Sequence, residues 1–171
     1  MSSTPAVTRV LGTMRRLPDG TGAVRMEDTY RTDLHDLWSA LTDPSRLARW
    51  IADVEGDLRL GGQFQATFTS SWEGTGRVEV CVAPHRLVVR LWEEADDETV
   101  VEATLAAEGD VTRLVIEERG LPLGSISAYG AGWQAHVEDL AAYLGGRDDS
   151  GWQARWHQLR PIYDDLAAGL A

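Results

Sequence analysis

The chain has 171 residues, of which 43% are hydrophobic and 25% are charged, a composition typical of one soluble globular domain with its own apolar core. Its formal net charge is −11 without any cluster of basic residues, which argues against a nucleic-acid partner. The single cysteine excludes an internal disulfide and a paired-cysteine metal site, and no apolar run approaches the roughly 20 residues that span a bilayer. We therefore expect a cytoplasmic protein with no membrane segment, no metal and no cofactor.

The N-terminal region predicts a β-hairpin. Residues 7–17 and 23–31 favour extended structure. Between them, residues 18–22 read PDGTG, and proline, aspartate and glycine in such a cluster are strong turn signals. The first two strands should therefore pair with each other.

Two short helices are expected after this hairpin. Apolar residues recur at steps of three and four over residues 34–41, which is the spacing of one helical face. Asp43 suits a helix N-cap and Pro44 suits the first helical position, so a second helix is expected over residues 44–50.

The middle of the chain alternates apolar and polar residues with the period of two that is typical of strands. In the first such run, Gly61 and Gly62 are expected at a bulge or a sharp bend. One face of that run would carry Leu58, Leu60, Phe64, Ala66 and Phe68. Further strands, separated by turn signals, are expected at residues 76–82, 86–93, 99–106 and 112–119.

Two helices are expected at the C-terminal end. The apolar residues from Tyr129 to Leu144 are spaced for a helix of about four turns, and Gly145 follows them as a stop signal. Residues 152–170 have a second helical pattern, in which Pro161 should break or kink the helix. Its apolar stripe either packs on the same domain or forms a dimer contact, so the chain is expected to be a monomer or a homodimer. That stripe consists of Trp152, Trp156, Leu159 and Tyr163.

Together these elements predict an α+β fold in which a curved antiparallel sheet of about seven strands wraps around the long C-terminal helix. Strongly curved sheets often enclose a cavity against such a helix. We assign residues 1–150 to this domain, with its N-terminal hairpin, and residues 151–171 to a helical extension of the same domain.

Four stretches carry a family resemblance, in the order WSALTDPSRLARWI, DLRLGGQFQATF, GTGRVEVCVAPHRLVVRLWE and GWQAHVEDLAAYLGG. Over roughly residues 20–146 the chain resembles the START-like (SRPBCC) helix-grip superfamily. Within it, the chain is most similar to the branch named after the activator of the heat-shock-protein-90 ATPase. The superfamily includes lipid carriers, polyketide cyclases, hydroxylase domains and resistance proteins.

This resemblance implies a deep pocket between the sheet and the long C-terminal helix. The helix would contribute Tyr129, Trp133, Val137 and Leu140 to the pocket wall and the core. The sheet would place opposite them Phe64, Phe68, Val80, Trp92, Leu105 and Ile116.

Two more residues are candidates for the pocket from their positions. His136 follows Trp133 by three residues and therefore borders the apolar face of the helix. There it would either hydrogen-bond a neighbour or offer a ligand a polar group or a base. Trp72 lies where a strand reverses, so it either rims the pocket mouth or is a surface aromatic residue.

Three strand carboxylates, Glu93, Glu117 and Glu118, have two alternative interpretations. One that faces inward beside apolar walls would have a raised pKa and could act as a general acid or base. One that faces outward would lie on a solvated strand face or pair with arginine. The candidate arginine partners are Arg90, Arg113 and Arg119.

No established catalytic motif stands out: the sequence has no GxSxG, no cysteine–histidine pair, no phosphate loop and no dinucleotide fingerprint. We therefore predict that the chain binds a hydrophobic or aromatic small molecule in an internal pocket, for sequestration, transport, sensing or resistance. The first alternative is a polyketide cyclase or aromatase-like enzyme that uses the same pocket. The second is a protein-interaction role of the co-chaperone kind, as the branch name suggests.

Overall fold

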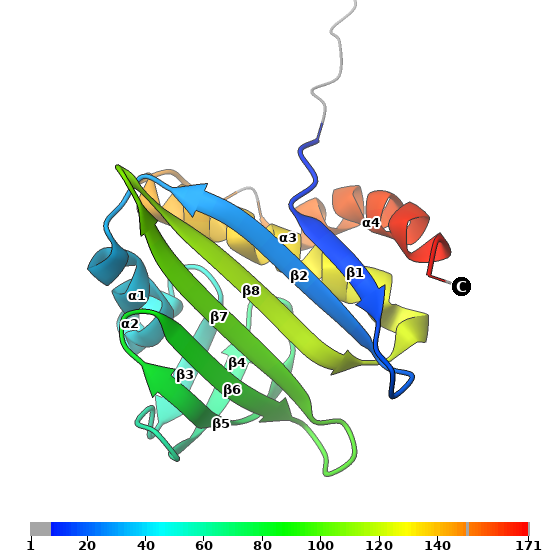
Figure 1. Ribbon diagram of the computed structural model, residues 1–171, viewed down its shortest axis with the longest axis horizontal. Coiled ribbons are helices and arrows are strands. Elements are labelled where there is room, and N and C mark those ends of the chain that lie inside the picture. The colour runs from blue at the N-terminus through cyan, green and yellow to red at the C-terminus, as the bar shows by residue number, and fades with distance from the viewer. Residues whose placement is uncertain (1–7, 150, 171) are drawn as a thin grey trace, which may run out of the picture.

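The computed structural model describes residues 8–149 and 151–170 and shows one antiparallel sheet packed against helices (Figure 1). The eight strands lie in the order β1-β2-β8-β7-β6-β5-β4-β3. Val7, the start of the first expected strand, and Ser150, the last residue assigned to the helix-grip domain, lie outside the described residues. The strands are β1 (Gly12–Arg16), β2 (Gly22–Tyr30), β3 (Ala52–Gly56), β4 (Gln63–Phe68), β5 (Glu73–Val82), β6 (Arg86–Trp92), β7 (Thr99–Glu108) and β8 (Val111–Leu121).

The expected N-terminal hairpin is present and determines which strands meet in the sheet. β1 pairs with β2, and Gly20 in the turn between them has a φ of 88°, a value that favours glycine. β2 then pairs with β8, so the N-terminal hairpin lies beside the last strand rather than beside the next strand in sequence. The helix-grip fold expected from the sequence is thus confirmed, with eight strands instead of about seven.

The additional strand is β3, and its presence corrects the expected run from residue 58 to 69. Residues 57–62 form a turn in which the Asp57 carboxylate accepts a hydrogen bond from the Arg59 N–H at 3.0 Å. Leu60 is 66% exposed, so it does not share a buried strand face with Phe64. The apolar alternation in the sequence therefore runs across a turn and not along one strand. The Asp57 hydrogen bond and the positive φ of 80° at Gly61 define that turn.

The two short helices are α1 (Leu34–Thr42) and α2 (Pro44–Leu47). The Asp33 carboxylate accepts a hydrogen bond from Asp36 N–H at 2.8 Å and caps α1, while Asp43 caps α2 by accepting from Ser45 N–H at 2.9 Å. The Trp50 indole N–H donates to the Ala40 carbonyl at 2.9 Å. This bond ties the segment after α2 back to α1, so both helices form one cap at an end of the sheet (Figure 1).

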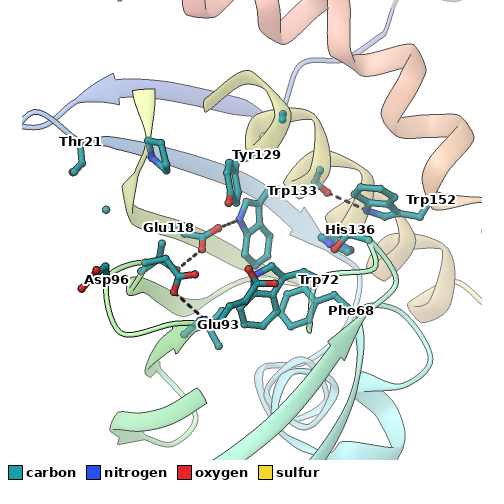
Figure 2. Close-up of a pocket in the computed structure, with 18 residues that line it drawn as sticks. Thr21, Phe68, Trp72, Glu93, Asp96, Glu118, Tyr129, Trp133, His136 and Trp152 are labelled. Atoms are coloured by element: carbon teal, nitrogen blue, oxygen red, sulfur yellow. Dashed lines mark hydrogen bonds between the residues drawn. The ribbon is translucent and has the colours of Figure 1, made fainter. Parts of the chain in front are cut away.

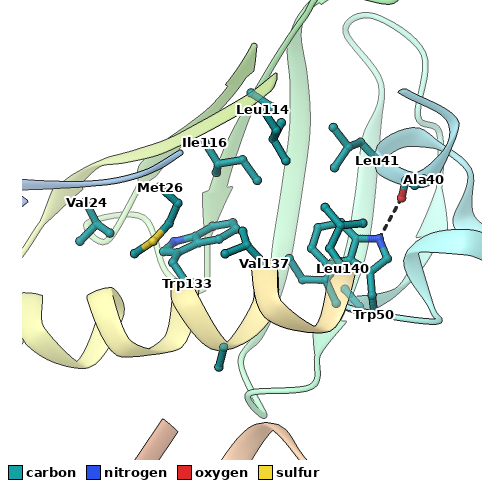
Figure 3. Packing of buried hydrophobic residues seen from close by; sticks show 14 of the residues in the cluster. Val24, Met26, Ala40, Leu41, Trp50, Leu114, Ile116, Trp133, Val137 and Leu140 are labelled. Atoms are coloured by element: carbon teal, nitrogen blue, oxygen red, sulfur yellow. Dashed lines mark hydrogen bonds between the residues drawn. The ribbon is translucent and has the colours of Figure 1, made fainter. Parts of the chain in front are cut away.

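The long helix α3 (Ile126–Leu144) lies against one face of the sheet, which we call the inner face. A short 3-10 turn, η1 (Leu123–Ser125), leads into it from β8. Side chains of α3 pack on strand residues of the inner face in one apolar core, which Figure 3 shows. This core includes Val24, Met26, Leu114, Ile116, Trp133, Val137 and Leu140.

The last helix, α4 (Trp152–Ala168), packs on α3 and also reaches β1 of the sheet, where the Gly12 N–H donates to the Tyr163 hydroxyl at 3.1 Å. α4 continues through Pro161, so of the two expected outcomes, a break or a kink, the break is wrong. Buried residues on both sides of that proline hold the two halves of α4 in place: Leu159 is fully buried, and the Tyr163 hydroxyl donates to the Gln134 side-chain oxygen at 2.5 Å. The apolar stripe of α4 therefore packs on its own chain. No helix of the described part of the chain is both long and apolar enough to cross a bilayer.

Candidate functional site

A cavity of about 520 Å³ lies between the first half of α3, the start of α4 and the ends of strands β4, β6, β7 and β8 (Figure 2). We call it the first cavity. Aromatic side chains from three separate parts of the chain form much of its wall. They are Phe68 and Trp72 around the β4–β5 turn, Tyr129 and Trp133 on α3, and Trp152 at the start of α4.

Local sequence positions these rings. Tyr129, Trp133 and His136 are spaced by four and three residues, so they project from one side of α3. Phe68 and Trp72 face each other because the tight turn between them closes with a hydrogen bond from Phe68 N–H to the Trp72 carbonyl at 2.8 Å. Their ring centroids lie 5.3 Å apart in an edge-to-face arrangement.

His136 links these aromatic groups. Its ring centroid lies 5.9 Å from that of Phe68, 5.7 Å from that of Trp133 and 5.3 Å from that of Trp152. The residue is only 4% exposed, and burial lowers its pKa to about 3. Nδ1 lies 3.5 Å from the Thr69 hydroxyl oxygen, a long contact. At neutral pH the imidazole is therefore uncharged.

Glu118 is the carboxylic acid of the cavity wall. Along β8, Leu114, Ile116 and Glu118 alternate onto the inner face, which places this carboxyl group inside. It accepts hydrogen bonds from the Thr99 hydroxyl at 2.7 Å and from the Trp133 indole N–H at 2.8 Å (Figure 2). Burial raises the pKa of Glu118, and the two hydrogen bonds oppose that rise.

The other two strand carboxylates lie elsewhere. Glu117 points to the outer face of the sheet, where it is bonded to Arg15 and Arg119. Glu93 lies at the rim of the first cavity together with Asp96 and Asp97. Of the three strand glutamates, Glu118 is therefore the one that corresponds to an inward acid.

A second cavity of about 180 Å³ lies between the inner face and the cap formed by α1 and α2. Phe64 and Ile116 contribute to its wall, which is almost entirely apolar. Phe68, Leu91 and Trp133 line both cavities and thus form the partition between them.

The structure distributes ten of the twelve predicted pocket residues over three environments. Tyr129, Trp133, His136, Phe68 and Trp72 line the first cavity, and Phe64 and Ile116 line the second. The three residues Leu105, Val137 and Leu140 are buried in the solid core instead.

Val80 and Trp92 do not line either cavity, which corrects their assignment to the pocket wall. Val78 faces inward, but a bulge between Val78 and Val80 shifts the register, so Val80 pairs with Val88 on the outer face. Trp92 follows the inward-facing Leu91 and therefore also points outward.

The sequence analysis did not predict Trp152 as a residue of the site, and it left the orientation of Glu118 open. Trp152 belongs to the stripe assigned to helix packing, and no sequence signal separates its role in the cavity from that packing. The inward orientation of Glu118 could have been predicted, because Glu118 continues the alternation of Leu114 and Ile116 along the strand. In the part of the chain that the structure describes, no three His, Cys, Asp or Glu side chains are grouped as metal ligands.

Fold and site together define an SRPBCC-type helix-grip protein, in which a cavity lies between the sheet and the long C-terminal helix. Residues 31–145 match the model of the family described as Activator of Hsp90 ATPase homolog 1-like protein, and the chain belongs to this family. No curated protein sequence matches the chain.

Solved structures extend the comparison. The crystal structure of CalU16 from Micromonospora echinospora is 26% identical, with a TM-score of 0.77 over 91% of this chain and 96% of that chain. DynU16, from the dynemicin biosynthetic locus, is 25% identical, with a TM-score of 0.68 over 74% of this chain and 49% of that one. An HSP90 activator from Plasmodium falciparum is 22% identical, with a TM-score of 0.62 over 72% of this chain and 96% of that chain, and shows the shared fold.

Proposed function

We propose that the chain binds a hydrophobic small molecule with an aromatic or polycyclic body in the first cavity. The observation that carries this proposal is a space of about 520 Å³ lined by five aromatic side chains and closed at one wall by a buried carboxyl group. Small-molecule sites in proteins occupy about 300–1,000 Å³ and combine apolar walls with a few polar groups.

The wall suggests how such a ligand is held. The rings of Trp72, Trp133 and Trp152 offer flat apolar surfaces, while Glu118 offers a hydrogen-bonding group next to Trp133. Because Phe68, Leu91 and Trp133 line both cavities, a longer molecule would reach the second cavity by displacing one of these side chains. The place of DynU16 in a biosynthetic locus supports a natural product as the ligand class.

An enzyme of the cyclase kind is the second candidate, and a specific observation favours it. Glu118 and His136 are both buried and both line the first cavity. A buried carboxyl group with a raised pKa can exchange a proton with a bound molecule, and an uncharged imidazole can act as a general base. A ligand that binds and leaves unchanged supports the carrier or sensor role, whereas a new product that Glu118→Gln abolishes supports the enzyme.

The test of binding uses the neutral fluorescent probe N-phenyl-1-naphthylamine. We expect saturable binding that quenches tryptophan emission and raises the melting temperature. Trp72→Ala should weaken binding, because its ring forms part of the wall. Trp92→Ala is the matched control: it removes a tryptophan from the outer face and should leave the affinity unchanged. Absence of saturable binding, or equal loss in both variants, would contradict the proposal.

A further inference from the structure

The carboxyl groups around the first cavity differ from those on the rest of the sheet. Across the outer face, glutamates pair with arginines, as in Arg86–Glu102 and Arg15–Glu117. Within residues 8–149 and 151–170, none of the cavity carboxylates forms such an ion pair. These four residues are Glu93, Asp96, Asp97 and Glu118.

The described wall of the first cavity offers these carboxylates no cationic partner. Among the described residues that line the first cavity there is no arginine or lysine, and His136 is uncharged at neutral pH. Three of these carboxylates affect the same residue of the cavity wall, Tyr129. Burial raises the pKa of Tyr129, and the charges of Glu118, Glu93 and Asp97 raise it further. A molecule entering the cavity therefore meets a negative potential.

Glu118 is the deepest of these groups. It is buried, and Figure 2 shows it between Trp133 and the turn that carries Glu93 and Asp96. Burial raises the pKa of Glu118, but an ammonium group beside it favours the ionised form. Its two oxygens accept one hydrogen bond each, from Thr99 and Trp133, while an ionised carboxylate has about four acceptor positions. It can thus accept further hydrogen bonds from a ligand without losing its present partners.

The aromatic wall fits a cation as well. The faces of Trp, Tyr and Phe rings carry a negative electrostatic potential and attract ammonium groups within about 6 Å of the ring centroid. Tyr129 and Trp133 flank Glu118, and Trp72 lies at the rim with Glu93. Anionic ligands, in contrast, would be repelled by the four carboxylates and would find no charged partner.

We propose that the first cavity selects ligands in which a basic amine is attached to the apolar body, and that Glu118 receives the ammonium group, with Glu93 and Asp96 attracting it at the entrance. This inference rests on the proposed function, because it assumes that the first cavity is the ligand site. Beyond the proposed function, it specifies that the ligand is positively charged and that Glu118 recognises this charge.

The test uses three compounds that share one ring system and differ in charge: 1-naphthylmethylamine, 1-naphthylmethanol and 1-naphthoic acid. Calorimetric titration at pH 7 should show that the ammonium compound binds about tenfold more tightly than the alcohol. The carboxylate should bind most weakly. Equal affinity of the amine and the alcohol, or tighter binding of the carboxylate, would overturn the inference.

Variants then assign the preference to Glu118. Glu118→Gln keeps the shape of the side chain but removes its charge, so the amine should lose its advantage while the alcohol still binds, which also shows that the cavity has formed. Asp96→Asn should give a smaller loss that disappears in high salt, because its carboxylate is exposed. Glu117→Gln, one residue away on the outer face, is the matched control and should leave the preference intact.

The outcomes separate the two proposals. If the alcohol and the neutral probe bind but charge has no effect, the cavity is a ligand site and the amine preference is refuted. If none of the compounds binds, the proposed function is refuted and this inference with it. If Glu118→Gln and Glu117→Gln lower the amine affinity equally, Glu118 is not the recognising residue.

Discussion

The two halves of α3 have similar apolar spacing but form different structures. Tyr129 and Trp133 in the first half border the first cavity, whereas Val137 and Leu140 in the second half are buried in a solid core. The difference comes from what faces them: the cap of α1 and α2 brings Leu41 and Trp50 into contact with the second half (Figure 3). On the side that carries Tyr129 and Trp133, the first half instead faces the ends of strands, the loops next to them and the start of α4. A helical face thus becomes a core or a cavity wall according to the elements opposite it.

The largest effect that would test this contrast is expected for Leu140→Ala. Leu140 is fully buried, so the truncation leaves a hole in packed surroundings and should lower the free energy of unfolding by about 3–5 kcal/mol. Urea denaturation measures this change. Binding of N-phenyl-1-naphthylamine to the remaining folded protein should be unaffected, and a small stability change would show that the second half of α3 is not solidly packed.

The next effect concerns acid stability. The pKa of His136 is about 3 in the folded chain and near 6.5 when unfolded, so the unfolded state binds more protons between these values and stability is lost as pH falls through them. In the wild type this should cost about 2–3 kcal/mol between pH 7 and pH 4. His136→Gln should flatten that slope in denaturation curves measured at both pH values. An unchanged slope would mean that the ring is hydrated or paired in the acid range.

Asp139, one turn further along α3, should show the opposite slope. Burial and the charges of Asp149 and Glu138 raise its pKa to about 7, so the folded state holds the extra proton and stability falls as pH rises from about 4 to 7. Asp139→Asn should therefore stabilise the protein by about 1 kcal/mol at pH 8, with the gain vanishing toward pH 4. Thermal unfolding at the two pH values checks this, with Asp148→Asn as a control on the exposed loop.

The smallest stability effect is expected for Tyr129→Leu. Its ring borders the first cavity, so its loss enlarges a space that already exists and should change the free energy of unfolding by less than about 1 kcal/mol. Affinity for the naphthyl compounds should fall several-fold. A stability loss as large as that of Leu140→Ala would remove the contrast between the two halves of α3.

Much of the fold was predictable because local signals agreed with the final structure. The turn before Gly22, the caps Asp33 and Asp43 and the spacing on α3 each specify their element through hydrogen bonds or side-chain periodicity within a few residues. β3 was missed because it has only five residues: Ala52 and Val54 alternate with Asp53 and Glu55, but so short a run becomes a strand by pairing with β4. The continuation of α4 through Pro161 likewise depends on packing against α3.

The sequence by itself determined the class of fold, the acidic character, and an aromatic helix face with His136 beside it. Only the tertiary structure decided which strand side chains face the cavity. One bulge near Val80 reverses the facing of the residues beyond it, while alternation on β8 directs Glu118 to the inner face. It also decided that Trp152, distant in sequence, completes the wall. The physical reason is that secondary structure depends mainly on residues close together in the sequence. A cavity, in contrast, is the space that remains where elements distant in sequence do not pack completely against one another.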